Sequence, residues 1–564
     1  MMKCIKILLA LSTIWLADVV GDSSSNDDGN TILSSPPSAF PVTQYTFHTN
    51  LDHFRYKLNP NRQFATLPLR YFVNDDHYLA ENSGPVLFYA GNEADIMQFV
   101  NNSGFLFETA EEFQALVVFA EHRYYGTSFP NETDIVDEAD YMSFLTVEQA
   151  MEDYNALTLH IRTKWNMPSD TAFVAMGGSY GANLALWLRM KNPNLWAGAI
   201  ASSATPLKHI LRETNHFTLI ETQAYGNVSS RCPDLVRAGW KDLYHFAGPN
   251  ATHQEKASVA NALGLCKPQP AEKPRPGMLH DWISGALETM VQYGYPYPTS
   301  FYNPVPAFPF RVACHRMIEA GTGLGALRAA ADVYYNYTGQ AGSCYGKDFI
   351  EHHTIQHLHR KGQLDRLPVE SKIFHGTSER DTVRSRRNGA GVLKVVGVDV
   401  RDVENVPLRN LRQDEINAWG YQVCTEVYQP MPTDGITDFE VPYTPNKTAY
   451  FDHCWKRYGV APRANWEEHH FMGFDIGSVS NVFLSNGQLD PWRAAGIQTL
   501  PPGASPTSII IRTIEDGAHH LDLRSSHPLD PASVIEVRKE ETEAMVRWIK
   551  EWKQLHPPTS ASSL

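Results

Sequence analysis

The sequence predicts an α/β fold in which a mainly parallel sheet carries helices on both faces and receives a large helical insertion. Three observations lead to this fold. Apolar runs of strand length alternate with amphipathic helical patterns up to about residue 204. The alternation then stops, and the pattern from Leu207 to Phe474 is helical and irregular. Alternation resumes at Ser480–Ser485, so the last strands complete a sheet that began before the insertion.

The strands are expected at the short apolar runs, in chain order. These are Arg70–Val73, Pro85–Ala90 and Leu116–Ala120, then Thr171–Met176 and Trp196–Ala204, and after the insertion Ser480–Ser485 and Thr507–Ile514. A long helical pattern with early acidic residues, Thr146–Lys164, leads the chain to the fourth strand. The insertion therefore lies over the carboxyl ends of the strands, where open α/β sheets keep their sites.

The fourth strand passes through Gly177-Gly-Ser-Tyr-Gly181 directly into the helical pattern Asn183–Lys191. A tight strand-to-helix turn needs nearly side-chain-free flanking positions, which Gly177 and Gly181 supply, and it projects the serine hydroxyl outward. The simpler alternative is a glycine-rich turn that has no catalytic role. Because the motif has both of its required flanks, the sequence predicts the nucleophile elbow of an α/β-hydrolase, with Ser179 as nucleophile.

A serine hydroxyl needs a base to take its proton and a carboxylate to orient that base. In this fold the chain order is serine, acid, histidine, with the last two on loops after late strands. Asp490 follows the strand Ser480–Ser485, and His519 and His520 follow the strand Thr507–Ile514. A single Asp or His here is more often a capping or surface residue, but three matches in the required order predict a catalytic triad.

The backbone amide of Tyr180, next to the nucleophile, is expected to form half of an oxyanion hole. The second amide is expected in the polar loop Gly91–Asp95, from Asn92 or Glu93, because the loop directly follows an early strand. An ordinary helix cap is the equally simple alternative for this loop.

The beginning of the chain predicts secretion. Residues 1–21 combine two lysines, a short apolar run and small residues, as in a signal peptide, and residues 22–43 resemble a disordered linker or pro-region. No apolar run reaches the roughly 18 residues of a membrane span, so a soluble mature protein is expected. The net charge of −14 and the lack of a basic stripe argue against a nucleic-acid partner.

Cysteines and sequons agree with the secretory pathway. Six cysteines remain after the signal peptide, and they predict three disulfides without choosing among 15 pairings: Cys232, Cys266, Cys314, Cys344, Cys424 and Cys454. Glycosylation sequons occur at Asn101, Asn131, Asn227, Asn250, Asn336 and Asn446. No Cys-x-x-Cys pair is present, and the histidines at 352, 353, 357 and 359 have no visible partner ligands, so we expect no metal and no cofactor.

Several motifs together resemble the serine peptidase family of dipeptidyl peptidase II and lysosomal Pro-X carboxypeptidase. They are Gly177–Gly181, Glu121-His-Arg-Tyr-Tyr-Gly126, Asn486-Gly-Gln-Leu-Asp-Pro-Trp492 and Gly517-Ala-His-His-Leu-Asp-Leu-Arg524, supported by Tyr295-Pro-Tyr-Pro298 and Trp419–Glu426. The resemblance covers roughly residues 45–350 and 418–555. Its fold is an α/β-hydrolase with a helical, disulfide-bearing cap, which agrees with the fold predicted from the pattern.

The resemblance implies an exopeptidase that cleaves beside proline or another small residue at one end of a peptide. It implies His519 as the base and the disulfides Cys232–Cys314, Cys266–Cys344 and Cys424–Cys454. Trp492 and Tyr295 are expected to form a wall for a flat proline ring, and Asn183 is expected to make the pocket more polar than in the family. The run Ser526–Val534 is closer to dipeptidyl peptidase II, which favours release of N-terminal Xaa-Pro or Xaa-Ala dipeptides over removal of a C-terminal residue after proline.

We therefore expect a hydrolase domain at residues 44–207 and 475–556 and a cap at 208–474. Within the cap, Gln356–Arg412 is a basic tract that matches nothing in the family, either a protease-sensitive loop or a misassembled piece of the gene model. An esterase and a catalytically silent binding protein of the same fold are the alternatives. The expected location is the lysosome, another vesicle or the outside of the cell, and the oligomeric state stays open, with a homodimer as one possibility.

Overall fold

A computed structural model describes residues 40–55, 66–130, 138–266, 275–366, 417–473 and 475–557. The predicted signal peptide, most of the predicted linker, Asn131 and residues 367–416 lie outside the described residues. The described chain forms one compact unit.

Eight strands form a single sheet in the order β1-β2-β4-β3-β5-β6-β7-β8. Their bounds are β1 Thr43–Asn50, β2 Thr66–Asn74, β3 Val86–Ala90, β4 Leu116–Ala120, β5 Phe173–Gly178, β6 Gly198–Ser202, β7 Val482–Gly487 and β8 Ile509–Ile514. The pairs β1–β2 and β2–β4 are antiparallel, and all other pairs are parallel. The sheet resumes after the insertion as predicted, because β7 pairs with β6. The edge strand β1 was not predicted, since its side chains are mostly exposed and polar.

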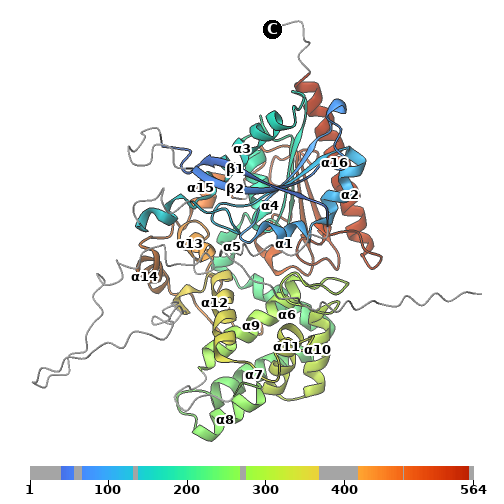
Figure 1. Ribbon diagram of the computed structural model, residues 1–564. Coiled ribbons are helices and arrows are strands. Elements are labelled where there is room, and N and C mark those ends of the chain that lie inside the picture. Colours follow the sequence, from blue (N-terminus) through green and yellow to red (C-terminus); the bar gives the residue numbers. More distant parts are fainter. Residues whose placement is uncertain are drawn as a thin grey trace, which may run out of the picture. The chain divides into compact units, whose positions relative to one another are not determined.

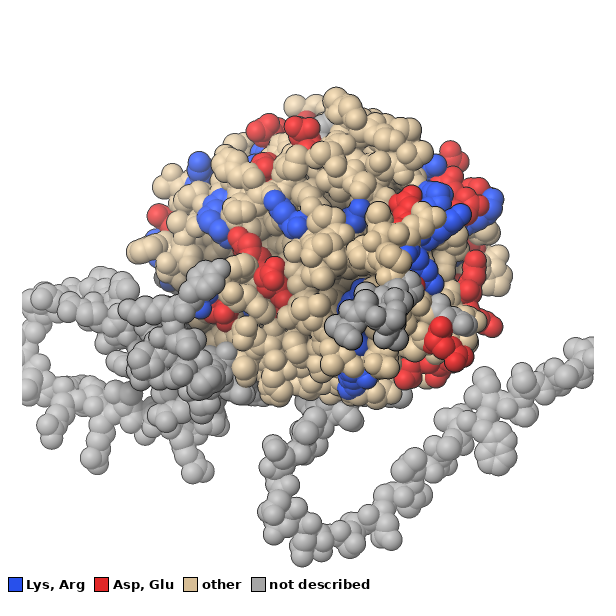
Figure 2. Space-filling view, turned by 90° about the horizontal axis from the view of Figure 1, so that it is seen from above, with Lys and Arg blue, Asp and Glu red and all other residues tan. Residues whose placement is uncertain are grey.

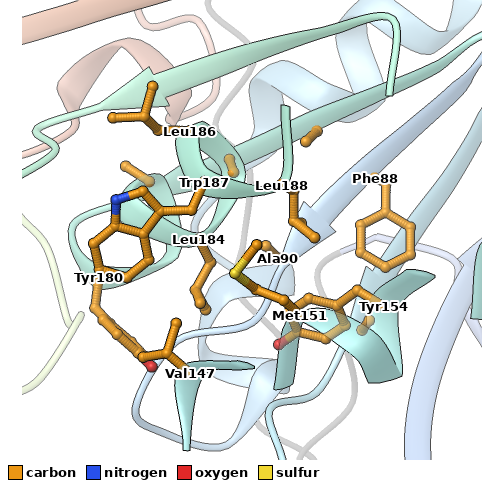
Figure 3. Packing of buried hydrophobic residues seen from close by; sticks show 14 of the residues in the cluster. Phe88, Ala90, Val147, Met151, Tyr154, Tyr180, Leu184, Leu186, Trp187 and Leu188 are labelled. Atoms are coloured by element: carbon orange, nitrogen blue, oxygen red, sulfur yellow. The ribbon is translucent and has the colours of Figure 1, made fainter. Parts of the chain in front are cut away.

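Successive strand residues bury against opposite faces of the sheet, as the pleat requires. Phe88 and Ala90 of β3 belong to one apolar cluster, while Leu87 and Tyr89 belong to another. Figure 3 shows the first cluster, in which Phe88 and Ala90 meet side chains such as Met151, from a helix on that face. Both faces are therefore covered, as the sequence predicts for an α/β-hydrolase.

The helices outside the insertion cover the sheet on its two sides (Figure 1). The helices that pack on the face of Phe88 and Ala90 are α3 Val147–Lys164 and α4 Tyr180–Lys191. The helices that pack on the face of Leu87 and Tyr89 are α1 Ile96–Val100, α2 Gly104–Phe113 and α16 Ala532–Leu555. Short 3-10 helices are η1 Ala80–Asn82, η3 Glu138–Phe144, η4 Leu364–Arg366, η8 Pro491–Ala495 and η9 Leu521–Leu523.

Between β6 and β7 the described chain is helical, with a core of its own. The helices are α5 Lys208–Glu213, α6 His216–Val228, α7 Arg231–Phe246, α8 His253–Ala262, α9 Pro276–Gln292, α10 Pro309–Ala320, α11 Gly323–Tyr335, α12 Lys347–Arg360, α13 Ala418–Thr425, α14 Lys447–Tyr458 and α15 Trp466–Phe471. Trp282, Leu287 and Met317 belong to this separate apolar cluster. In Figure 1 the helices α6–α12 lie together on one side of the sheet-bearing part.

Acidic and basic side chains are interspersed on the face shown in Figure 2. Among the described residues, we find no helix with the length and apolar character needed to span a membrane.

Candidate active site

Ser179 occupies the turn between β5 and α4 with φ 59° and ψ −125°. A positive φ is strained for a residue with a side chain, and such strain is typical of functional turns. A Cβ on Gly177 would lie 2.2 Å from the carbonyl oxygen of Gly181, and one on Gly181 would lie 2.5 Å from Oδ1 of Asn92. Only glycine fits at both positions, so the turn has the form that a nucleophile elbow requires.

Asp490 and His519 meet as the predicted chain order requires. Oδ2 of Asp490 lies 2.7 Å from Nδ1 of His519, and both side chains are fully buried. The other carboxylate oxygen accepts the N–H of Trp492 at 3.0 Å, which caps η8 and fixes the orientation of the acid. Because Asp490 accepts the proton at Nδ1, Nε2 of His519 is left as the basic nitrogen, and it has no hydrogen-bond partner among the described residues.

The backbone of His519 is held by the end of α9 and the segment after it. Its N–H donates to the carbonyl of Gln292 at 2.9 Å, and its carbonyl accepts from the hydroxyl of Tyr295 at 2.9 Å. Tyr295 is completely buried and lies outside the cavity wall, contrary to the sequence prediction. A buried tyrosine hydroxyl needs a partner, and here that partner is the carbonyl of His519.

His520 has a different environment from its neighbour. Its N–H donates to Oγ of Ser203 at 2.9 Å, and its ring fills the space beside Gly178. Burial lowers the pKa of the His520 imidazole well below its ordinary value, and the adjacent His519 adds to this effect. The structure therefore brings His519, and not His520, to Asp490.

The loop expected to complete the oxyanion hole is fixed from both ends. Nδ2 of Asn92 donates to the carbonyl of Gly178 at 2.6 Å, and its Oδ1 accepts the hydroxyl of Tyr89 at 3.0 Å. At the other end, the N–H of Ile96 donates to Glu121 at 3.2 Å. Asn92, Glu93, Ser179 and Tyr180 line the same cavity, so the residues predicted to supply the oxyanion hole border the same space as Ser179.

The motif Glu121–Gly126, which carries part of the family resemblance, packs beside the turn that holds Ser179. Glu121 pairs with Arg70, and His122 contacts the hydroxyl of Tyr180 at 3.1 Å through Nε2. Burial lowers the pKa of His122 to about 4, and its Nδ1 donates to a backbone carbonyl, so Nε2 accepts the hydroxyl proton of Tyr180. Gln422 of α13 donates to the same hydroxyl at 2.9 Å. The residue after the nucleophile is thus fixed by two buried partners.

A cavity of about 610 Å³ opens in front of Ser179. Trp492 lines it as predicted and packs edge to face against Phe217 at 4.9 Å. Asn183 is buried behind the wall, contrary to expectation, because its amide is satisfied by Thr205: its Oδ1 accepts the Thr205 N–H at 2.8 Å and its Nδ2 donates to Oγ1 at 3.2 Å. Thr205 lines the cavity in its place.

The structure contains the three disulfides that the resemblance implies: Cys232–Cys314, Cys266–Cys344 and Cys424–Cys454. Among the predicted sequons, Asn227, Asn250 and Asn446 are exposed, while Asn101 and Asn336 are half-buried, and glycosylation stays a prediction. In the described part of the chain, no group of three or more histidine, cysteine or carboxylate side chains is arranged to hold a metal ion.

The beginning of the tract Gln356–Arg412 is folded, which contradicts the expectation of an exposed loop there. Residues 356–366 are described, and they form the end of α12 and the short helix η4. His357, Leu358 and Leu364 are buried there, so this part is no exposed loop.

The family model of serine carboxypeptidase S28 matches residues 49–367 and 398–541. The unmatched internal interval is therefore 368–397, which is shorter than the tract Gln356–Arg412 that was expected to match nothing in the family.

Curated relatives extend over most of the chain. Lysosomal Pro-X carboxypeptidase of Bos taurus is 32% identical over 556 residues, which cover 97% of this chain and 96% of the relative. The protein of the same name from Homo sapiens is 31% identical, covering 93% and 92%. Thymus-specific serine protease of Homo sapiens is 23% identical, covering 85% and 82%. With this family match and an elbow, acid and base in the order that the fold requires, the chain is a serine peptidase and belongs to the S28 serine carboxypeptidase family.

Proposed function

We propose that this peptidase removes the C-terminal residue from peptides with proline in the penultimate position. The observation that carries this proposal is the charge of the catalytic cavity. Among the described residues, three cationic side chains line it, Lys208, Arg360 and Arg457, against one carboxylate, Glu93. Lys208 is paired with Glu467 at 2.7 Å, whereas neither arginine has a carboxylate within ion-pair distance among the described residues. A cavity with an excess of positive charge suits a substrate carboxylate.

Burial raises the pKa of the Glu93 carboxyl above its ordinary value, so this group carries less negative charge in acid. The relatives named lysosomal Pro-X carboxypeptidase support the same activity. In this proposal Trp492 contacts the proline ring, as an apolar wall does for a flat ring.

The proposed chemistry is acyl transfer in two stages. Oγ of Ser179 attacks the proline carbonyl while Nε2 of His519 takes its proton, and Asp490 stabilises the imidazolium. The amide of Tyr180 and one amide of Asn92 or Glu93 donate to the oxyanion. His519 then protonates the leaving amine of the C-terminal residue, and a water molecule hydrolyses the acyl-enzyme by the reverse use of the same groups.

Release of N-terminal Xaa-Pro or Xaa-Ala dipeptides is the second candidate activity, and the position of one carboxylate favours it. Oε2 of Glu93 is buried and has no hydrogen-bond partner among the described residues, so it could hold a substrate ammonium. The run Ser526–Val534, which resembles dipeptidyl peptidase II, supports the same reading.

A pair of substrates separates the two activities. We expect the enzyme to cleave an N-acetylated peptide ending in Pro-Phe with a free carboxylate and to leave Lys-Pro and Lys-Ala amides intact. Cleavage of the free-amine amides, with none of the acetylated peptide, would establish the dipeptidyl peptidase instead. Because Ser179→Ala should abolish either activity, it controls for a contaminating peptidase.

We further propose a lysosomal or secreted location, from the names of the lysosomal relatives and of a probable extracellular serine carboxypeptidase that is 26% identical over 92% of the chain. The substrates are proposed to be peptides, and a homodimer stays a proposal that size measurement in solution would test.

A further inference from the structure

Arg360 ends helix α12 and lines the catalytic cavity. Its Nε is buried and has no hydrogen-bond partner among the described residues. One terminal nitrogen makes a long contact of 3.4 Å with Oγ1 of Thr289. A guanidinium normally uses its fork of donors on carboxylates or carbonyls, so the buried Nε of Arg360 is an unused donor.

The carboxylate that acts on Arg360 already has other partners. Glu288 of α9 lies 3.2 Å from Nδ1 of His357 and 3.6 Å from Nζ of Lys361. Lys361 is almost fully buried and depends on Glu288 for an ion pair. Arg360 itself has no carboxylate within ion-pair distance among the described residues, so its guanidinium has no direct ion-pair partner there. A half-buried cation without a direct ion-pair partner is unfavourable, and a bound anion would relieve this cost.

Tyrosine side chains connect Arg360 to the catalytic base. Tyr302 and Tyr334 line the cavity, and both act electrostatically on Arg360. The ring of Tyr302 lies 5.2 Å from that of Tyr293, and Tyr293 lies 6.1 Å from the ring of His519. Tyr293, Tyr302 and Tyr334 thus form an aromatic part of the cavity wall that also contains Arg360.

Lys208 and Arg457, the other two cations that line the cavity, are less suited to bind an anion. Lys208 is engaged with Glu467. Arg457 of α14 is exposed, so water screens its charge and competes for its donors. Of these three side chains, Arg360 is the one that combines a place in the cavity wall with a buried donor, Nε, that has no hydrogen-bond partner among the described residues.

We propose that Arg360 binds the C-terminal carboxylate of the substrate and, with the hydroxyl of Tyr302, selects peptides with a free C-terminus. This inference rests on the proposed carboxypeptidase activity, and it names the group that recognises the substrate end. Arg360 is a specificity-determining residue in this role, since bond cleavage itself is assigned to Ser179 and His519.

The test compares two peptides that differ in one group, acetyl-Ala-Pro-Phe and its C-terminal amide. The quantity measured is the ratio of kcat/KM for the free acid to kcat/KM for the amide. We expect the wild-type enzyme to prefer the acid, and Arg360→Gln to reduce this ratio on the order of 10²-fold, as for loss of one partner of a buried charge pair. Arg360→Lys, which keeps the charge without the fork, should retain part of the preference.

Arg457→Gln provides the matched comparison, because it removes one positive charge from the same cavity. We expect it to change the ratio less than threefold. Labelling of Ser179 by a fluorophosphonate reports whether each variant has folded with an intact catalytic centre.

The outcomes distinguish the two proposals. A wild-type enzyme that ignores the terminal carboxylate contradicts the proposed carboxypeptidase activity itself. A wild-type preference that survives Arg360→Gln, or that is lost in Arg457→Gln instead, overturns the role of Arg360 and leaves the activity intact. If Arg360→Gln fails to label at Ser179, Tyr302→Phe is used in its place, and a ratio equal to that of the wild type would count against the site.

Discussion

Asp490 and His519 are 2.7 Å apart, fully buried, and contributed by loops after adjacent strands of the sheet. The carboxylate accepts the Nδ1–H of His519, and in the proposed mechanism Nε2 takes the proton of Ser179. We expect Ser179→Ala, His519→Ala and Asp490→Asn each to lower kcat on the order of 10⁴-fold, measured on a proline-containing peptide.

His520→Ala is the control for the choice of base. Since His520 has no contact with Asp490 in the described structure, we expect a smaller loss than in His519→Ala. The assignment of the base is wrong if the two losses change places.

The side chain of Asn92 ties the oxyanion loop to the elbow strand through Gly178 and Tyr89. Without it, the amides beside Ser179 are no longer held in place. We expect Asn92→Ala to lower kcat by about 10²-fold, with KM changed much less, because an oxyanion donor acts in the transition state. Steady-state kinetics measure both constants.

Tyr89→Phe offers a milder form of the same test. It removes one hydrogen bond to Asn92 and leaves the contact with Gly178, so its effect on kcat should be smaller than that of Asn92→Ala. A wild-type kcat in Asn92→Ala would mean that this loop does not supply the second donor.

The disulfide Cys424–Cys454 joins α13 to α14, and α13 carries Gln422, which donates to the Tyr180 hydroxyl. Replacing both cysteines by alanine should lower the free energy of unfolding by about 2–4 kcal/mol, and it should lower kcat because Tyr180 loses a fixed partner. Denaturant unfolding and peptide kinetics measure the two effects.

Replacing Cys266 and Cys344 is the matched control, since neither flanks a residue of the catalytic loops. Here we expect a comparable loss of stability with kcat preserved. Equal losses of kcat in both double variants would show that only general unfolding is being measured.

Glu541 of α16 is buried, and both burial and the neighbouring Asp522 raise the pKa of its carboxyl well above the ordinary value. The folded protein holds a proton on Glu541 more tightly than the unfolded chain does. The stability that this proton contributes is fully present below the unfolded-state pKa of about 4.3 and is lost as pH rises through the folded-state pKa. Glu541→Gln mimics the protonated acid. We expect it to raise Tm relative to the wild type at pH 8 and to leave Tm nearly unchanged at pH 4.

Glu543→Gln, on the exposed side of the same helix, controls for the loss of one surface charge. Parallel curves of Tm against pH for the wild type and Glu541→Gln would contradict the prediction. Thermal unfolding followed by circular dichroism provides the curves.

The sequence alone determined the elements that depend on local pattern. The run of apolar residues before Ser179, the two glycines around it and the helical pattern after it are short-range features, so they predict the elbow directly. Chain order and strand ends then indicate Asp490 and the pair His519 and His520, because parallel strands bring their carboxyl ends to one edge; the choice of His519 came from the resemblance. The disulfide pairing came from the resemblance, since spacing leaves 15 possibilities open.

Only the tertiary structure decided which side chains face the cavity. Tyr295 and Asn183 have the right chemistry for a pocket, yet each is turned inward by a partner distant in sequence, His519 for the first and Thr205 for the second. The reverse holds for Arg360, which lies in a tract that the sequence sets aside and which reaches the cavity through the packing of α12 on α9. Burial and charge compensation depend on contacts between distant segments, and a local pattern carries no record of them.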